Sequence, residues 1–350
     1  PRSQVTAAIA HGWCTDIFLA DDSVFHGASA FIEVLVRVLT HVEAIAEQHG
    51  RELPRHIVLQ ADNAVAQCKN AEVLTFLAHI VGKGKFSTAT LNFLMVGHTH
   101  EDVDQLFGLI CASVLRRFCW ETLDDLIGFL EAHIGPHIAQ KQEECWITQL
   151  CAVRDFNTWL APHGVHPWNA LRTRDGIEAP HSFTFKHRQD LTKSELDEFR
   201  SQVNGAARHA GYGDRNSSQS DVFCCVKTYM RDRHLQQAPV LIMPEDRCSW
   251  VQNLAPTTCL AAPISDERAA KLLKLATIFE KESYGFHRAA VEIRRLVERP
   301  PLELPPPGWL ASPPRAPALV QVTGNPYFAH LPETSWNLLV TFHRRLGQAQ

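Results

Sequence analysis

The sequence predicts an α/β fold in which a mixed sheet with parallel members is covered by helices. Three observations support this prediction. Strand-like and helix-like segments alternate over residues 5–118, in the order strand, strand, helix, strand, helix, strand, helix. Residues 28–48 carry apolar side chains at helical spacing, and residues 57–59 form the short apolar run that is typical of a buried central strand. Alternation of this kind is characteristic of sheets with parallel strands and crossing helices.

The individual elements follow from periodicity and from residues that begin or end helices. Ser29 is suited to the N-cap of the first helix, and Gly50 to its C-terminal stop. We expect the first two strands to form a hairpin that turns near Cys14 and Thr15. The expected elements are strands at 5–13, 16–24, 56–62 and 88–96, and helices at 28–48, 70–81 and 98–118.

Beyond residue 120 the patterns predict further helices, loops and two short strands. We expect helix at 121–152, 191–210 and 264–298, loop-rich chain at 153–190, strands at 222–230 and 239–243, and a proline-rich linker from residue 299. The predicted organisation is an α/β domain over 1–150, a smaller α+β extension over 151–260, a helical segment at 264–298, and a linker and tail at 299–350.

Composition restricts the class of protein. Hydrophobic residues make up 45% and charged residues 21%, as in ordinary globular proteins. No apolar run suits a membrane span, no signal peptide begins the sequence, and the ten cysteines include no C-x-x-C pair. We therefore expect buried thiols and a nuclear or cytoplasmic protein that is not secreted. The net charge of −4 means that DNA would have to meet a local basic patch.

The first segment that could carry chemistry follows the strand at 56–62. Asp62 ends that strand, and a carboxylate at such a place can bind a hard cation such as magnesium. Asn63 could supply or orient a ligand, and Lys69 could neutralise a phosphate. The alternative is that Asp62 and Asn63 only cap the turn into the next helix, with Asn70 nearby.

The second segment, Gly97–Gln105, follows the next strand and reads GHTHEDVDQ. Glu101 and Asp102 suit the first turn of a helix, where acids are favourable, so a structural role for them stays open. Asp104 lies beyond the cap, and His100 and Asp104 share one helix face. Because functional groups gather at the carboxyl ends of parallel strands, we expect both segments to form one site.

These two segments resemble an uncharacterised family of eukaryotic, transposon-associated proteins. The shared features are D-N followed by K-N, here Asp62-Asn63 and Lys69-Asn70, and the motif F-L-x-V-G-H-T-H-E-D-V-D-Q-x-F over residues 93–107. Looser similarity covers most of residues 1–245. The family looks like a derivative of DDE-type transposases, which have a ribonuclease-H-like fold.

The resemblance implies metal-dependent cleavage or strand transfer at DNA phosphodiester bonds with two magnesium or manganese ions. It assigns Asp62 and Asp104 as metal ligands, with Glu101 and Asp102 as alternatives. It makes His98 and His100 groups that support ligands or transfer protons, with Asn63, Asn70 and Gln105 in supporting places. The first acid of such sites lies on a first strand, which this sequence is expected to lack before Pro1; Asp16 or Asp21 is the substitute if the strands are counted differently.

Other readings stay open. The same fold could serve as a catalytically inactive DNA- or protein-binding module, alone or as a homo-oligomer. The G-H-T-H run is also found in metallophosphoesterases, but their upstream motifs are absent from residues 1–96. Arg116 and Arg117 are the predicted contacts to a phosphate backbone. Lys227, Arg231, Arg233 and His234 form a second basic cluster with no assigned role.

Overall fold

The structure is a computed structural model, and it describes most of the chain up to residue 298 and one later strand. The described residues are 4–20, 24, 27–61, 68–93, 102–141, 143–160, 180–206, 218–229, 231–243, 265–281, 286–298 and 337–346.

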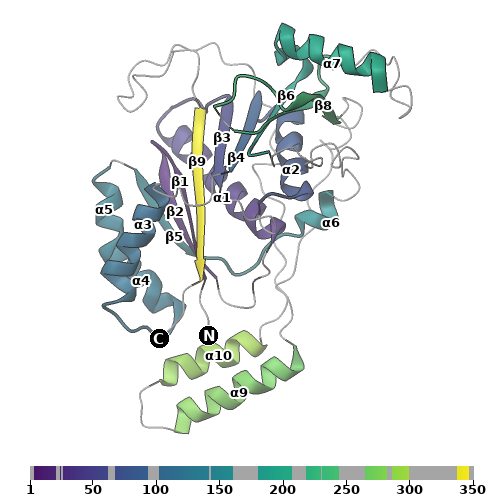
Figure 1. Ribbon diagram of the computed structural model, residues 1–350. Coiled ribbons are helices and arrows are strands. Elements are labelled where there is room, and N and C mark those ends of the chain that lie inside the picture. The colour runs from purple at the N-terminus through teal and green to yellow at the C-terminus, as the bar shows by residue number, and fades with distance from the viewer. Residues whose placement is uncertain are drawn as a thin grey trace.

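Among these residues, nine strands form a single mixed sheet, with the strand order β5-β2-β1-β9-β3-β4-β6-β7-β8 (Figure 1). The strands are β1 (Gln4–Ala10), β2 (Cys14–Ala20), β3 (His56–Ala61), β4 (Thr88–Phe93), β5 (Glu144–Gln149), β6 (Ser182–His187), β7 (Val222–Lys227), β8 (Gln237–Met243) and β9 (Asn337–Leu346).

The strand β9 occupies the centre of this sheet although it comes last in the chain. It pairs antiparallel with β1 and parallel with β3, and β3 pairs parallel with β4. The other neighbours of β1 and β3 are β2 and β4, so among the described residues the two halves of the sheet are joined through β9. Figure 1 shows it as the long yellow arrow between the two halves.

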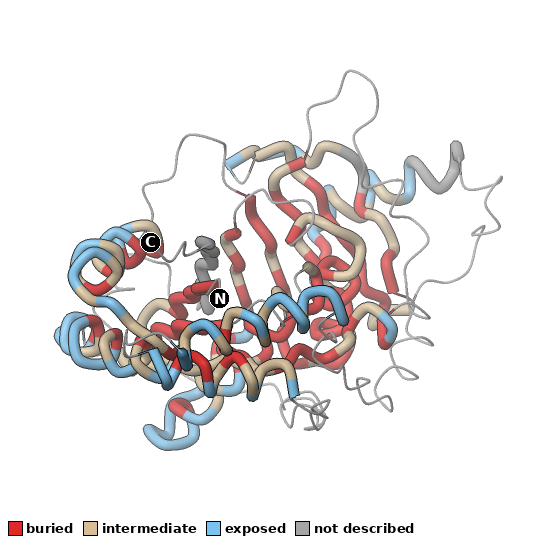
Figure 2. The backbone as a smooth tube through the Cα atoms, turned by 90° about the horizontal axis from the view of Figure 1, so that it is seen from below, coloured by how far each residue is buried: buried red, intermediate tan, exposed pale blue. Residues whose placement is uncertain are grey.

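Helices cover both faces of the sheet. On one face, α1 (Ala28–Gln48), α2 (Ala71–Gly82) and α6 (Phe156–Leu160) pack on the larger core, which contains the buried side chains of Ile57, Leu59 and Leu91. On the other face, α3 (Asp102–Ile110), the π-helical turn η1 (Cys111–Leu115), α4 (Leu123–His133) and α5 (Gly135–Ala139) cover β1 and β2. Figure 2 shows many strand residues as buried, and the exposed residues in it lie mostly on the helices.

The remaining helices lie at the periphery. The helix α7 (Lys193–Ala206), preceded by the short 3-10 helix η4 (Arg188–Asp190), packs against β7 and β8 around Phe199 and Phe223. The helices α9 (Asp266–Lys281) and α10 (His287–Glu298) pack on each other around Ala276, Ala290 and Ile293. Figure 1 shows this pair as a hairpin below the sheet.

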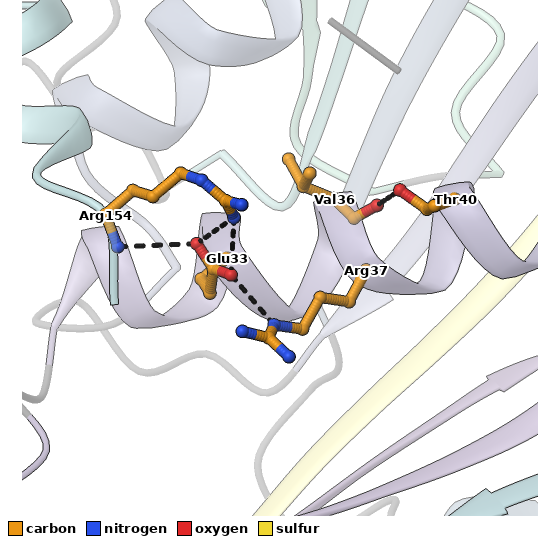
Figure 3. Close-up of polar contacts among 5 residues, drawn as sticks. All are labelled: Glu33, Val36, Arg37, Thr40 and Arg154. Atoms are coloured by element: carbon orange, nitrogen blue, oxygen red, sulfur yellow. Dashed lines mark hydrogen bonds and ion pairs between the residues drawn. The ribbon is translucent and has the colours of Figure 1, made fainter. Parts of the chain in front are cut away.

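A buried ion cluster ties the first helix to the segment after β5 (Figure 3). The Glu33 side chain is fully buried in α1. Its carboxylate accepts bonds from Arg154 Nη1 at 2.7 and 2.8 Å and from Arg37 Nε at 2.8 Å. The backbone N–H of Arg154 donates a further bond to Glu33 Oε2 at 3.3 Å. These bonds compensate for removing the carboxylate from water and hold residues 153–156 against α1.

Several expected elements differ from the structure. The helix expected at 98–118 is described only from α3 through η1, and the helix expected at 121–152 ends by residue 139 and is followed by β5. The loop-rich region 153–190 contains α6 and β6, and the tail contains β9. The strands expected in a smaller extension, β7 and β8, continue the main sheet through β6.

The first hairpin forms as expected, but its turn comes earlier in the chain. Gly12 has φ of 74°, in the left-handed region that glycine adopts without strain, and Trp13 N donates to Ala10 O at 2.9 Å. The expected turn residues Cys14 and Thr15 are therefore the first residues of β2.

The expectations for membrane segments and thiols can be compared with the same described residues. Within them, no helix combines the length and the apolar character that crossing a bilayer requires. Cysteines in these segments are free thiols, of which Cys14, Cys68, Cys224 and Cys225 are buried as expected, whereas Cys119 is exposed.

Candidate functional site

Two parallel strands lead to the segments that carry the candidate residues. In the pairing of β3 with β4, Ala61 lies opposite Phe93, so both strands end at the same level of one sheet edge. We call this the carboxyl edge of β3 and β4. The segments that follow, 62–67 and 94–101, lie outside the described residues. The assignments of Asp62, Asn63, His98, His100 and Glu101 therefore stay predictions.

The residues that follow the first of these segments begin α2. Asn70 is the N-cap of that helix, and its side chain accepts a bond from Val73 N at 3.0 Å. This contact gives the expected supporting residue Asn70 a helix-capping role. The Lys69 ammonium lies 5.3 Å from the centre of the Phe93 ring, and burial lowers the pKa of Lys69. Lys69 thus lies at the carboxyl edge of β3 and β4. The expectation that its positive charge neutralises a phosphate there stays a prediction.

The described candidates of the second segment lie in α3. Asp102 is about half exposed, and its Oδ2 lies 3.7 Å from Nδ1 of His11, the residue after β1. Burial lowers the pKa of His11, and the nearby Asp102 carboxylate acts in the opposite direction. Asp104 is part-buried, whereas Gln105 is exposed. Asp102 is therefore directed toward the end of β1, and Asp104 is the more enclosed carboxylate.

The basic residues predicted to contact DNA end the same helical region. Arg116 and Arg117 follow η1 and are both exposed. Their exposure is compatible with contact to an external phosphate backbone, and that contact stays a prediction.

The side chains described near this edge can be compared with the ligands that a magnesium ion needs. Asp102 and Asp104 offer carboxylate oxygens, which are the ligands that magnesium prefers. Within the described residues, however, no three or more His, Cys, Asp or Glu side chains are grouped so as to hold a metal. The residues that the structure describes therefore do not by themselves form a complete ligand set for magnesium.

A comparison with protein-family models assigns the chain to a family. Residues 2–204 match the model described as "Domain of unknown function (DUF7869)", which is more than half of the 350 residues. The chain belongs to this DUF7869 family. No curated protein and no solved structure matches the chain. The family match covers α1, β3, α2, β4 and α3, and so includes both candidate segments.

Asp16, which was considered as a substitute for the first acid of a transposase-like site, lies in the interior of the protein. Asp16 lies in β2 beneath α1 and is fully buried. Its Oδ1 lies 2.8 Å from His41 Nδ1, and the Cys14 thiol donates to its Oδ2 at 3.7 Å. Burial raises the pKa of Asp16, and the bond to His41 opposes that shift. Its contacts make Asp16 an internal residue of the core. The other substitute, Asp21, lies outside the described residues.

The register of the sheet brings two further side chains to the carboxyl edge of β3 and β4. The backbone N–H of Phe93 donates to His181 O at 2.8 Å, and His181 N donates to Thr228 O at 2.9 Å. The imidazole of His181 stacks on Tyr229, with ring centroids 5.6 Å apart. Sequence reasoning missed both rings, because only strand pairing shows that residues about 90 and 135 positions after the Phe93 region are neighbours. The one signal in the sequence was the looser family similarity, which covers most of residues 1–245 and so includes both rings.

Proposed function

We propose that this protein is a transposase-derived DNA-processing protein that cleaves or transfers phosphodiester bonds with magnesium or manganese. Asp62 and Asp104 are the proposed ligands, with Glu101 and Asp102 as the alternatives. The observation that carries the proposal is the parallel pairing of β3 with β4, with Ala61 opposite Phe93. It brings the ends of the two strands that precede the candidate segments to one sheet edge, where ligands of parallel sheets gather.

The strand arrangement supports a ribonuclease-H-like interpretation. If β9 is counted as the first strand, β1, β2 and β3 follow it, and β3 becomes the fourth strand with Asp62 directly after it. This is the place that the resemblance to DDE-type transposases gives to the second acid. The helix α3, which carries Asp104, then follows the next strand, β4.

The chemistry assigns separate tasks to the protein groups. Bound magnesium would favour deprotonation of the attacking water and stabilise the leaving oxygen. Lys69, beside the Phe93 ring, is placed to neutralise a phosphate oxygen. His98 and His100 would orient the carboxylates or accept the proton of the attacking group. Arg116 and Arg117 would contact the backbone outside the reacting phosphate.

A second function is favoured by one specific observation. The sequence of β9, NLLVTFHRRL, has no carboxylate, so the strand in the first position supplies no first acid. A domain that binds DNA or protein without cleaving it would keep the same sheet and would not need that acid. The two functions differ in whether bound DNA is cut.

Cleavage of supercoiled plasmid separates them. We would incubate the protein with plasmid in manganese, magnesium or EDTA, and compare it with the variants Asp62→Ala and Asp104→Ala. Asp197→Ala is a matched control, because Asp197 is an exposed aspartate of α7 that pairs with Arg200. Nicking that needs the metal, is lost in both site variants and persists in the control is expected for the nuclease. DNA binding without nicking would support the inactive DNA-binding module. The absence of both nicking and DNA binding would refute the nuclease and the DNA-binding module, and would leave the protein-binding module.

A further inference from the structure

The end of β7 and the turn after it carry unneutralised positive charge. Lys227 is the last residue of β7, and Arg231 and Arg233 lie exposed in the turn toward β8. Within the described part of the chain, no side-chain ion pair or hydrogen bond engages these three cations. The turn has one carboxylate, Asp232, whose Oδ2 accepts a bond from Tyr229 N at 2.8 Å. Asp232 therefore shapes the turn, and its charge is outnumbered by three cations.

A pair of stacked rings lies beside these cations. The rings of His181 and Tyr229 are 5.6 Å apart and inclined by only 17°, and both residues are part-exposed. Backbone bonds fix the pair from both sides, since His181 N donates to Thr228 O at 2.9 Å and Asp232 N donates to Tyr229 O at 3.1 Å. A flat ring system held in this way loses little conformational entropy when another ring stacks on it.

The cations and rings lie near the site proposed above. His181 O accepts a bond from Phe93, the last residue of β4 and the residue before segment 94–101. Strands β3, β4, β6 and β7 are consecutive neighbours in the sheet. At about 4.8 Å per strand, the end of β7 is about 14 Å from the end of β3. That distance is short enough for one single strand of nucleic acid to contact both places.

We propose that Lys227, Arg231, Arg233, His181 and Tyr229 form a binding site for a single-stranded segment of nucleic acid. The three cations bind consecutive phosphates, and an unpaired base stacks on the His181–Tyr229 pair. We call these five residues the β7 strand-binding site. Cations together with aromatic rings are the combination that binds single strands, because a duplex keeps its bases stacked on one another. The site rests on the proposed function in one respect, namely that the strand it holds is the one that carries the reacting phosphate.

Fluorescence anisotropy tests the site without any metal. The probe is a fluorescein-labelled 20-nucleotide oligo(dT), titrated in EDTA at several salt concentrations. For single strands, the slope of log K against log salt is about −0.7 per phosphate contact. The variant Lys227→Ala/Arg231→Ala/Arg233→Ala should therefore have a slope smaller by about 2. The matched control removes three exposed cations elsewhere, Arg200→Ala/Lys271→Ala/Lys274→Ala, and should leave the slope unchanged.

The ring pair has its own readout. Tyr229→Leu should weaken oligo(dT) binding by about tenfold, the loss expected for one stacked base, and leave the salt slope unchanged. Tyr229→Phe keeps a ring and should bind like the unchanged protein, which excludes a purely structural effect of the leucine variant. An oligo(rU) probe tests whether the site distinguishes ribose from deoxyribose, and binding of either strand supports the site.

Three results would overturn the site. These are unchanged affinity and slope in the triple cation variant, unchanged affinity in Tyr229→Leu, and competition by a poly-glutamate peptide as strong as that by the oligonucleotide. The proposed metal chemistry fails separately. If Asp62→Ala and Asp104→Ala leave metal binding unchanged while the cation variant still loses oligonucleotide binding, the strand-binding site stands and the metal assignment falls.

Discussion

Replacing Arg154 with methionine should destabilise the protein strongly, because it leaves a carboxylate buried with fewer partners. Glu33 has no exposed surface, and Arg154 contributes two side-chain contacts of 2.7 and 2.8 Å to it. Removing one partner of a buried ion pair costs about 3–5 kcal/mol. Arg37 keeps its 2.8 Å bond to Glu33 in the variant. We therefore expect a loss near the lower limit, about 3 kcal/mol in the free energy of unfolding.

Urea unfolding, followed by tryptophan fluorescence, measures that free energy. The double variant Glu33→Met/Arg154→Met should recover most of the loss, since no buried charge remains for the missing guanidinium. Arg288→Met is the matched control: its partner is Asp125 at 2.8 Å, but the arginine side chain is 64% exposed. This exposed pair should contribute only about 0–1 kcal/mol. A loss below about 1 kcal/mol for Arg154→Met, or a double variant less stable than the single one, would refute the reasoning.

Three further changes test other parts of the fold. Burial raises the pKa of Asp16, so the folded protein binds the proton more tightly and loses stability as the pH rises above the unfolded pKa. The stability of Asp16→Asn relative to the unchanged protein, measured by urea titration, should therefore increase as the pH rises above about 4, and an unchanged difference would contradict this. Val340→Pro removes a backbone donor in β9 and should abolish amide-exchange protection in both β1 and β3. Retained protection would show that β9 does not join the two halves of the sheet. Thr122→Ala removes the capping box that Thr122 forms with Asp125 at the start of α4 and should cost about 1 kcal/mol in thermal unfolding, and no change would contradict that contribution.

Much of the sheet and its helical cover could be predicted because its pattern is local. The helix expected at 28–48 is α1 with the same bounds, and the apolar run at 57–59 lies in the buried strand β3. Ser29, expected as the N-cap, lies within the first turn of α1, and Gly27 is the N-cap. The Ser29 hydroxyl is instead bonded to Asn157, a distant contact that the local sequence does not show.

The parts that could not be predicted depend on distant pairing. β9 follows a proline-rich stretch, and its place between β1 and β3 is set by partners more than 270 residues away. β5 was expected as helix, and its parallel pairing with β2 is also nonlocal. For the candidate site, the sequence predicted that Asp62 and the second segment follow neighbouring strands, and the pairing of Ala61 with Phe93 agrees with that prediction. It could not reveal that His181 and Tyr229 reach the same edge.

Calorimetric titration with magnesium and manganese is the most direct test of the proposed metal site at Asp62 and Asp104. We would compare the unchanged protein with Asp62→Ala, Asp104→Ala and the Asp197→Ala control. We expect metal binding that is lost in both site variants and kept in the control, because the proposed site includes both carboxylates. Binding that survives in Asp62→Ala and Asp104→Ala would contradict the assignment, and so would the absence of binding in the unchanged protein.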